Sequence, residues 1–147
     1  MQRHMIAFFS LLMLIAPPAK AAPTIELIEA FVAASVQARQ PDMRQEDLEH
    51  YLSFMSDDVV DYHAAYDRSF NGKSHLEKGI PNKAASMISM QQTIEHVLLG
   101  SNTAVVVVNE ASEYIKDGEP KLFLGRTILV LEFDSSDSIT HMRRYLD

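Results

Sequence analysis

Residues 103–133, TAVVVVNEASEYIKDGEPKLFLGRTILVLEF, have the pattern of two long β-strands joined by one tight turn. Both halves are rich in Val, Ile, Leu, Phe and Thr, the residue types that favour strands. Asp117-Gly118 between them is a strong signal for a two-residue hairpin loop. A turn at this position predicts that Val105 pairs with Val130, and that Asn109 pairs with Arg126.

Residues 139–147, ITHMRRYLD, predict a further strand after the loop DSSD. A four-residue loop would place His141 opposite Val130 and Arg143 opposite Ile128, and directly opposed side chains share a face of a sheet. One face then combines valines with six polar side chains, a mixture typical of a small-molecule pocket. We therefore predict that these residues bind a ligand: Asn109, Arg126, His141, Arg143, Tyr145 and Asp147. The alternative is that Arg126, Arg143 and Asp147 form an ion-pair cluster that only holds the sheet together.

The opposite face of the same strands is predominantly apolar. Burial of apolar area drives protein association, so we predict a homodimer formed through this face of the sheet. The residues expected at this interface are Val106, Val108, Leu129, Leu131, Met142 and Leu146.

The N-terminal half shows helical periodicity. Thr24 is expected to cap a helix that ends before Pro41, and Asp42 with Gln45 resembles the capping box of a second helix. Residues 73–80 predict a short helix stopped by Gly79 and Pro81, and residues 82–90 a further helical turn or two. From Gln91 onward the pattern changes to strands with short connections, which favour hairpins. The predicted fold class is α+β, with helices first and a long antiparallel sheet after them.

Residues 1–21 have the pattern of a secretory signal peptide. Arg3 precedes an apolar run from Met5 to Ala16, and Ala19-Lys20-Ala21 fits a cleavage site. The prediction is an exported protein, periplasmic or extracellular, with a single domain at 22–147. The alternatives are an uncleaved anchor and a buried core helix.

Charge and composition exclude several function classes. Loss of Arg3 and Lys20 with the signal peptide would lower the formal net charge of −7 to −9, which disfavours nucleic acids and anionic membranes as partners. The chain has no cysteine, so it forms no disulfides. No histidine motif typical of a metal site and no glycine-rich phosphate motif is present, so neither a metal nor another cofactor is predicted.

Asp61 and His63 are the candidate catalytic residues. They lie two apart on a predicted strand, so their side chains share a face. A histidine titrates near neutral pH, which suits a general acid or base. The alternative is a histidine that forms a structural hydrogen bond where the strand ends.

Residues 56–76, SDDVVDYHAAYDRSFNGKSHL, resemble the strand, loop, Phe-x-Gly turn and short helix of SnoaL-like domains in the nuclear transport factor 2-like superfamily. In the last strand this family often has an acid, an aromatic residue and an Asp, where this chain has His141, Arg143 and Asp147, so only the Asp is retained. The resemblance covers residues 24–147. It implies a cone-shaped α+β barrel with a pocket between the sheet and the helices.

Two kinds of function are compatible with this resemblance, because the family includes both enzymes and non-catalytic pocket proteins. The first is a cofactor-free isomerase, cyclase or hydratase acting on a small, partly apolar molecule. In it His63 or Asp61 would move the proton, and Arg126 or Arg143 would stabilise an anion or enolate. The second is a non-catalytic ligand-binding or dimeric assembly module. An acid–base pair within reach of a closed cavity would favour the enzyme.

Overall fold

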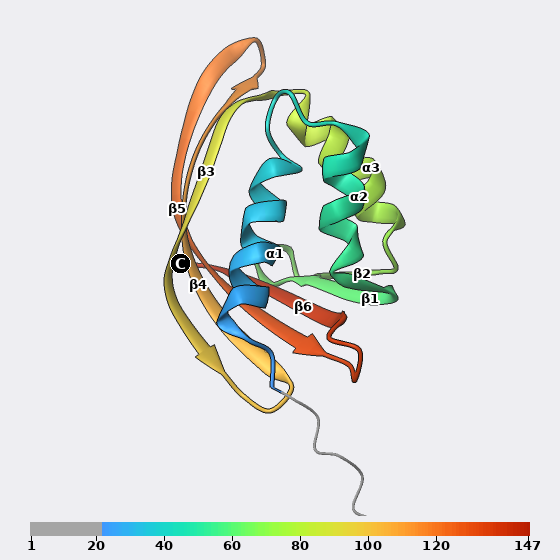
Figure 1. Ribbon diagram of the computed structural model, residues 1–147. Coiled ribbons are helices and arrows are strands. Elements are labelled where there is room, and N and C mark those ends of the chain that lie inside the picture. The colour runs from blue at the N-terminus through green and yellow to red at the C-terminus, as the bar shows by residue number, and fades with distance from the viewer. Residues whose placement is uncertain (1–21) are drawn as a thin grey trace, which may run out of the picture.

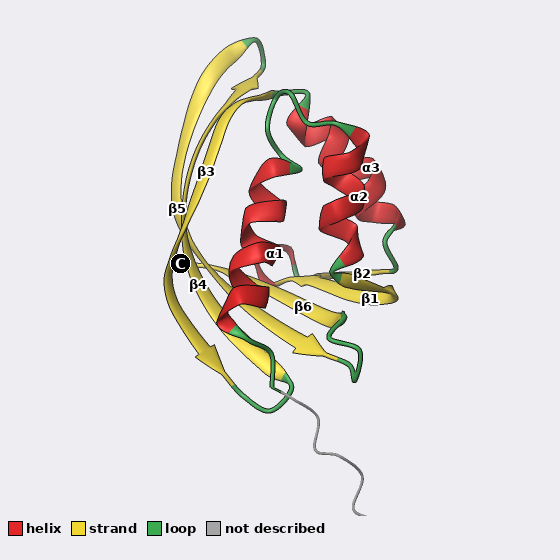
Figure 2. Cartoon of the chain, viewed as in Figure 1, coloured by secondary structure: helices red, strands yellow, loops and turns green. Residues whose placement is uncertain are grey.

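A computed structural model describes residues 22–147, in which helices pack against the concave side of one curved, six-stranded sheet (Figures 1 and 2). The predicted signal peptide at 1–21 lies outside the described residues. The elements are, in chain order, α1 (Ile25–Gln37), α2 (Gln45–Ser53), β1 (Met55–His63), the 3₁₀ turn η1 (Ala64–Tyr66), β2 (Arg68–Asn71), α3 (Ser74–Ala84), β3 (Met87–Leu99), β4 (Thr103–Lys116), β5 (Glu119–Phe133) and β6 (Ile139–Leu146).

The predicted start of α1 is confirmed and that of α2 is wrong. Thr24 caps α1 by accepting a hydrogen bond from the backbone N–H of Leu27. In α2 the N-cap is Arg44, because the Asp47 carboxylate accepts a hydrogen bond from its backbone N–H. The expected capping box of Asp42 and Gln45 lies two residues too early.

Helix α3 continues through the predicted stop at Gly79 and Pro81 and ends at Ala84. Proline lacks an N–H, so this helix loses one backbone hydrogen bond. Its apolar residues Leu76, Ile80 and Ala84 are buried at helical spacing, and this packing outweighs the lost bond. The strand that follows begins at Met87, earlier than the predicted start at Gln91.

The sheet is mixed and unclosed, with strand order β2-β1-β6-β5-β4-β3. All neighbouring pairs are antiparallel except β1 and β6, which run parallel. The α+β class, the curved sheet and the helices on one of its sides are confirmed, whereas the expected all-antiparallel pairing is wrong. The parallel pair arises because the chain returns to β1 only after α3 and the β3–β5 meander (Figure 1).

The register of β4 and β5 is confirmed: Val105 pairs with Val130, and Asn109 with Arg126. The predicted register of β5 and β6 is off by two residues, since Val130 pairs with Arg143. The connecting loop is longer than expected because the Asp134 carboxylate accepts hydrogen bonds from the backbone N–H groups of Ser136 and Ser138. A shift of two residues preserves which side chains share a face.

The predicted orientation of the sheet is wrong. The face expected to form a homodimer points to the helices and builds the hydrophobic core, where Val106, Val108, Leu131 and Met142 are fully buried. Of that set, only Leu146 is exposed. The homodimer itself stays a prediction. Within residues 22–147, no helix has the length and apolar character needed to cross a membrane.

Candidate functional site

A cavity of about 620 Å³ lies between the helices and the inner face of the sheet. Helix α1 contributes Phe31 and Ser35 to its wall, and the sheet contributes Thr127, Leu129 and Met142. Cavities of roughly 300–1,000 Å³ with a mostly apolar lining and a few polar groups are typical of small-molecule sites.

Phe123 on β5 forms part of the wall and lies over Gly125, two residues further along the same face of the strand. A Cβ atom at position 125 would overlap the Phe123 ring. The glycine therefore provides the space in which this aromatic side chain rests against the sheet.

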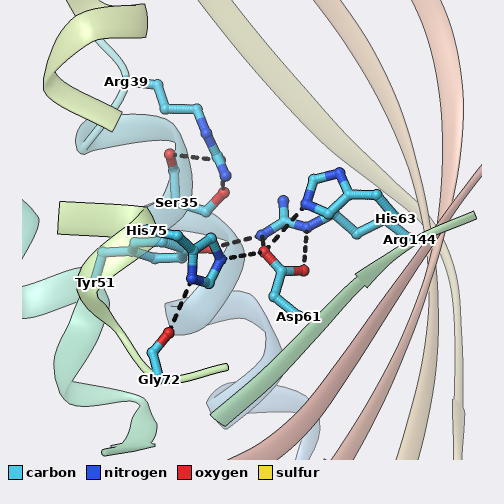
Figure 3. Close-up of polar contacts among 8 residues, drawn as sticks. All are labelled: Ser35, Arg39, Tyr51, Asp61, His63, Gly72, His75 and Arg144. Atoms are coloured by element: carbon cyan, nitrogen blue, oxygen red, sulfur yellow. Dashed lines mark hydrogen bonds and ion pairs between the residues drawn. The ribbon is translucent and has the colours of Figure 1, made fainter. Parts of the chain in front are cut away.

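Asp61, two residues before the end of β1, is the centre of a polar cluster (Figure 3). Its side chain is 0% exposed, and both carboxylate oxygens are bound. Arg144 on β6 donates from Nε to Oδ1 over 3.0 Å and from Nη2 to Oδ2 over 3.3 Å. The Nε2 atoms of His63 and His75 lie 3.2 Å and 3.1 Å from Oδ2. Arg144 also reaches the Tyr51 hydroxyl over 3.5 Å.

Both ring nitrogens of His75 face acceptor oxygens. Nδ1 lies 2.9 Å from the carbonyl oxygen of Gly72, and Nε2 faces Asp61. Only a ring with a proton on each nitrogen donates to both. The ring stacks on Phe70 of β2 with centroids 4.8 Å apart, which fixes its orientation.

The Asp61 carboxylate stays ionised despite its burial. Desolvation alone would raise the pKa of Asp61, but the hydrogen bond from His63 and the charge and hydrogen bonds of Arg144 outweigh it. The pKa of this carboxyl is held well below its usual range. Burial lowers the pKa of Arg144, yet the neighbouring Tyr51 and Asp61 more than offset this effect, so the pKa of Arg144 is raised.

His63 lies at the end of β1 and lines the cavity, with a side chain that is 29% exposed. Its Nε2 is held by Asp61, and Phe70 packs edge-on against its ring. Among the hydrogen bonds of residues 22–147, none involves Nδ1 of His63. The cavity therefore contains a histidine that a buried carboxylate orients, with one ring nitrogen available to a bound molecule.

A second polar group lines the cavity away from Asp61. Arg39 follows the end of α1 and donates to the carbonyl and hydroxyl oxygens of Ser35. Lys83 comes from the last turn of α3. Glu110 on β4 accepts hydrogen bonds from Gln92 and from Ser112. Desolvation, and then the charge of Arg39, lower the pKa of Lys83, and Glu110 opposes them.

None of the six side chains predicted to contact the ligand belongs to the cavity wall. They are Asn109, Arg126, His141, Arg143, Tyr145 and Asp147, and they lie on the outer face of the sheet. The expectation that this face lines the pocket is wrong because the sheet is turned the other way. Whether these residues bind any ligand stays an untested prediction.

The alternative prediction is a structural ion-pair cluster of Arg126, Arg143 and Asp147. Two of these three residues, Arg126 and Asp147, do form such a cluster on the outer face. Arg126 forms ion pairs with Glu95 over 2.9 Å and with Asp147 over 2.9 Å, tying β5 to β3 and to the end of the chain. Arg143 is not part of this cluster and pairs with Glu132 over 3.2 Å.

The structure brings Asp61 and His63 together at the cavity, as their spacing predicts, and adds residues that the sequence did not single out. Arg144 is distant from Asp61 in the chain, and only the β1–β6 pairing brings the two together. His75 reaches Asp61 because the Asn71-Gly72 turn folds α3 back beside β1. Across the described residues, no three His, Cys, Asp or Glu side chains gather as a metal site would need.

Comparisons with known proteins identify the fold. No protein-family model and no curated protein matches the sequence. A protein described as a SnoaL-like polyketide cyclase, from Shewanella denitrificans OS-217, superposes with a TM-score of 0.70 at 16% identity, covering 83% of this chain and 88% of that one. A protein with a ketosteroid isomerase-like fold from Catenulispora acidiphila DSM 44928, in complex with trimethylamine, superposes with a TM-score of 0.66 at 15% identity. The match covers 84% of this chain and 86% of that one.

A third solved structure, TerC co-crystallised with polyporic acid, has a TM-score of 0.62 at 17% identity and covers 84% of this chain and 90% of that chain. The chain therefore has the nuclear transport factor 2-like α+β fold. More narrowly, its solved structural neighbours include SnoaL-like polyketide cyclases and ketosteroid isomerase-like proteins.

Proposed function

We propose that this protein binds a small, partly apolar molecule in the cavity and performs cofactor-free acid–base chemistry on it, of the isomerase or cyclase type. The observation that carries the proposal is His63 at the cavity wall, with its Nε2 held by the buried Asp61 behind it. Solved structures of the same fold include proteins described as polyketide cyclases. An acid–base pair in reach of the cavity is the feature that distinguishes the enzyme from a non-catalytic binding module.

In this proposal His63 moves the proton and Asp61 orients it. Asp61 is fully buried and held by Arg144, so its oxygens do not face the cavity. The carboxylate holds the proton of the neutral His63 ring on Nε2 and leaves the lone pair of Nδ1 for the substrate. Transfer of a substrate proton to Nδ1 creates an imidazolium, which the ionised Asp61 stabilises.

The cavity part of the proposal is tested with N-phenyl-1-naphthylamine, a neutral probe that becomes fluorescent in apolar surroundings. We expect wild-type protein to bind it, and Ser112→Phe, which fills the cavity from β4, to lose most of the signal. The matched control is Ala111→Phe, on the exposed outer side of the same strand. Equal binding by both variants would show that the probe does not occupy the cavity. Mass spectrometry of molecules retained by wild type but not by Ser112→Phe would identify the natural ligand.

The acid–base part is tested by the tautomer of His63, measured by long-range ¹H–¹⁵N correlation of the imidazole rings. We expect the neutral ring of His63 to carry its proton on Nε2 alone, because Asp61 accepts it there. His50, which is exposed, is the control and should show the mixture of tautomers of a free ring. A neutral His63 with its proton on Nδ1 would contradict the proposed role of the Asp61–His63 pair.

Export also belongs to the proposal, on the strength of the signal-peptide pattern at residues 1–21. We expect the intact mass of the secreted or periplasmic protein to correspond to cleavage near Ala21. A membrane-bound species that retains Met1–Ala16 would favour an uncleaved anchor instead.

A further inference from the structure

We propose that the natural ligand carries an anionic group, such as a carboxylate, which Arg39 and Lys83 bind inside the cavity. This inference rests on the proposed function and adds the chemical class of the ligand. The anchoring residues differ from the arginines that the sequence suggested.

The first observation is the state of Arg39. The residue is only 6% exposed, and its guanidinium lies over the Tyr51 ring, 5.4 Å from the centroid. Its side-chain hydrogen bonds all come from Nη1 and go to Ser35. No ion pair within residues 22–147 includes it. A buried guanidinium without a carboxylate is costly, and its two remaining nitrogens are suited to a planar anion.

The second observation is the charge that surrounds the cavity. Arg39, Lys83, Lys116 and Arg144 all belong to the wall, against the single carboxylate of Glu110. The Arg144 charge is balanced by Asp61 just behind it, whereas the Lys83 ammonium has no hydrogen bond or ion pair among the described residues. This excess of positive charge occurs in a chain whose formal net charge is −7. An acidic protein with a basic cavity selects an anion over a cation.

The remaining acidic group does not neutralise these cations. Both oxygens of Glu110 accept hydrogen bonds from neutral donors, from Gln92 over 3.0 Å and from Ser112 over 3.1 Å. Glu110 forms no ion pair with Lys83. Its charge raises the pKa of Lys83 from a distance, whereas the charge of Arg39 lowers it. A ligand anion would complete the hydrogen bonds of Arg39 and Lys83 and reduce the repulsion between them.

The test uses three naphthalene probes that differ in the charge of one substituent: 1-naphthoate, the neutral 1-naphthamide, and 1-naphthylmethylammonium. Each competes with N-phenyl-1-naphthylamine in wild-type protein. We expect 1-naphthoate to displace it at concentrations about 10-fold to 100-fold lower than 1-naphthamide, as a charged hydrogen bond implies. The ammonium probe should be the weakest of the three.

Arg39→Met and Lys83→Met are each expected to remove most of the preference for 1-naphthoate while the neutral probe still binds. Lys78→Met, an exposed residue on the same helix, should keep the preference. The Lys83 ammonium has no hydrogen bond or ion pair among the described residues, so Lys83→Met breaks no contact of the fold and remains informative if Arg39→Met does not fold. Three results would each overturn the inference. They are equal displacement by 1-naphthoate and 1-naphthamide, stronger displacement by the ammonium probe, and a preference for 1-naphthoate that survives in Lys83→Met. If the neutral probe does not enter the wild-type cavity, the proposed function itself fails, and this inference fails with it.

Discussion

Replacing Arg144 by methionine is expected to lower the free energy of unfolding by about 3–5 kcal/mol, because it leaves the buried Asp61 carboxylate without its guanidinium. Methionine fills much of the same volume, so the loss reports the missing charge and hydrogen bonds more than a cavity. Urea unfolding at neutral pH measures it. Arg143→Met, at the adjacent position, is the matched control. Arg143 is exposed and pairs with Glu132 on the outer face, so its loss should cost about 0–1 kcal/mol.

The same network predicts how stability depends on acidity. The pKa of Asp61 is far lower in the folded chain than in the unfolded chain, where it is about 3.9. Below that value the unfolded chain binds the proton and the folded chain does not, so the free energy of unfolding falls as the pH drops further. At higher pH this contribution is fully present. In Asp61→Asn the acid dependence between about pH 5 and pH 2 should be shallower than in wild type. Equal slopes would show that other carboxylates control the acid transition.

Replacing Leu131 by glutamate is expected to abolish the folded state at neutral pH or lower its stability by about 5 kcal/mol. Leu131 is fully buried between the sheet and the helices. Loss of a buried leucine costs about 2–5 kcal/mol, and a carboxyl at this position must also be kept protonated against its normal pKa of about 4.3. The total is comparable to the whole stability of a small domain, about 5–15 kcal/mol. Thermal unfolding followed by circular dichroism measures this loss of stability.

Val130→Glu is the control, since Val130 is half-buried on the outer face of the same strand. We expect a much smaller loss of stability there. Light scattering on wild type and Val130→Glu also tests the predicted homodimer. The residues predicted to form the dimer interface lie largely in the hydrophobic core. A dimer through the sheet would therefore have to use its outer face. A wild-type monomer would refute the dimer, whereas a folded, monomeric Leu131→Glu would contradict the sheet orientation described above.

The β4–β5 hairpin could be predicted from sequence because its information is local. The Asp117-Gly118 turn requires a positive φ at both residues, which the structure shows, and this geometry sets the register of both strands. The Asp61–His63 pair was likewise predictable, because a spacing of two puts both side chains on one face of β1. The β5–β6 register was missed because side-chain hydrogen bonds of Asp134 reshape the loop, which shifts the pairing by one residue, and a bulge at Thr140 shifts it by one more.

By itself, the sequence determined the α+β class, the longest hairpin, and which side chains share each face of the sheet, all of which follow from local periodicity and turn chemistry. It did not determine which face is the inner one, because the run Val105–Val108 is apolar on both sides of the strand. Only the packing of the helices decided that Val106 and Val108 are core. The partners of Asp61 were decided in the same way. Arg144 and His75 reach it through a parallel strand pairing and a folded-back helix, and such long-range contacts leave no periodic signal in the chain.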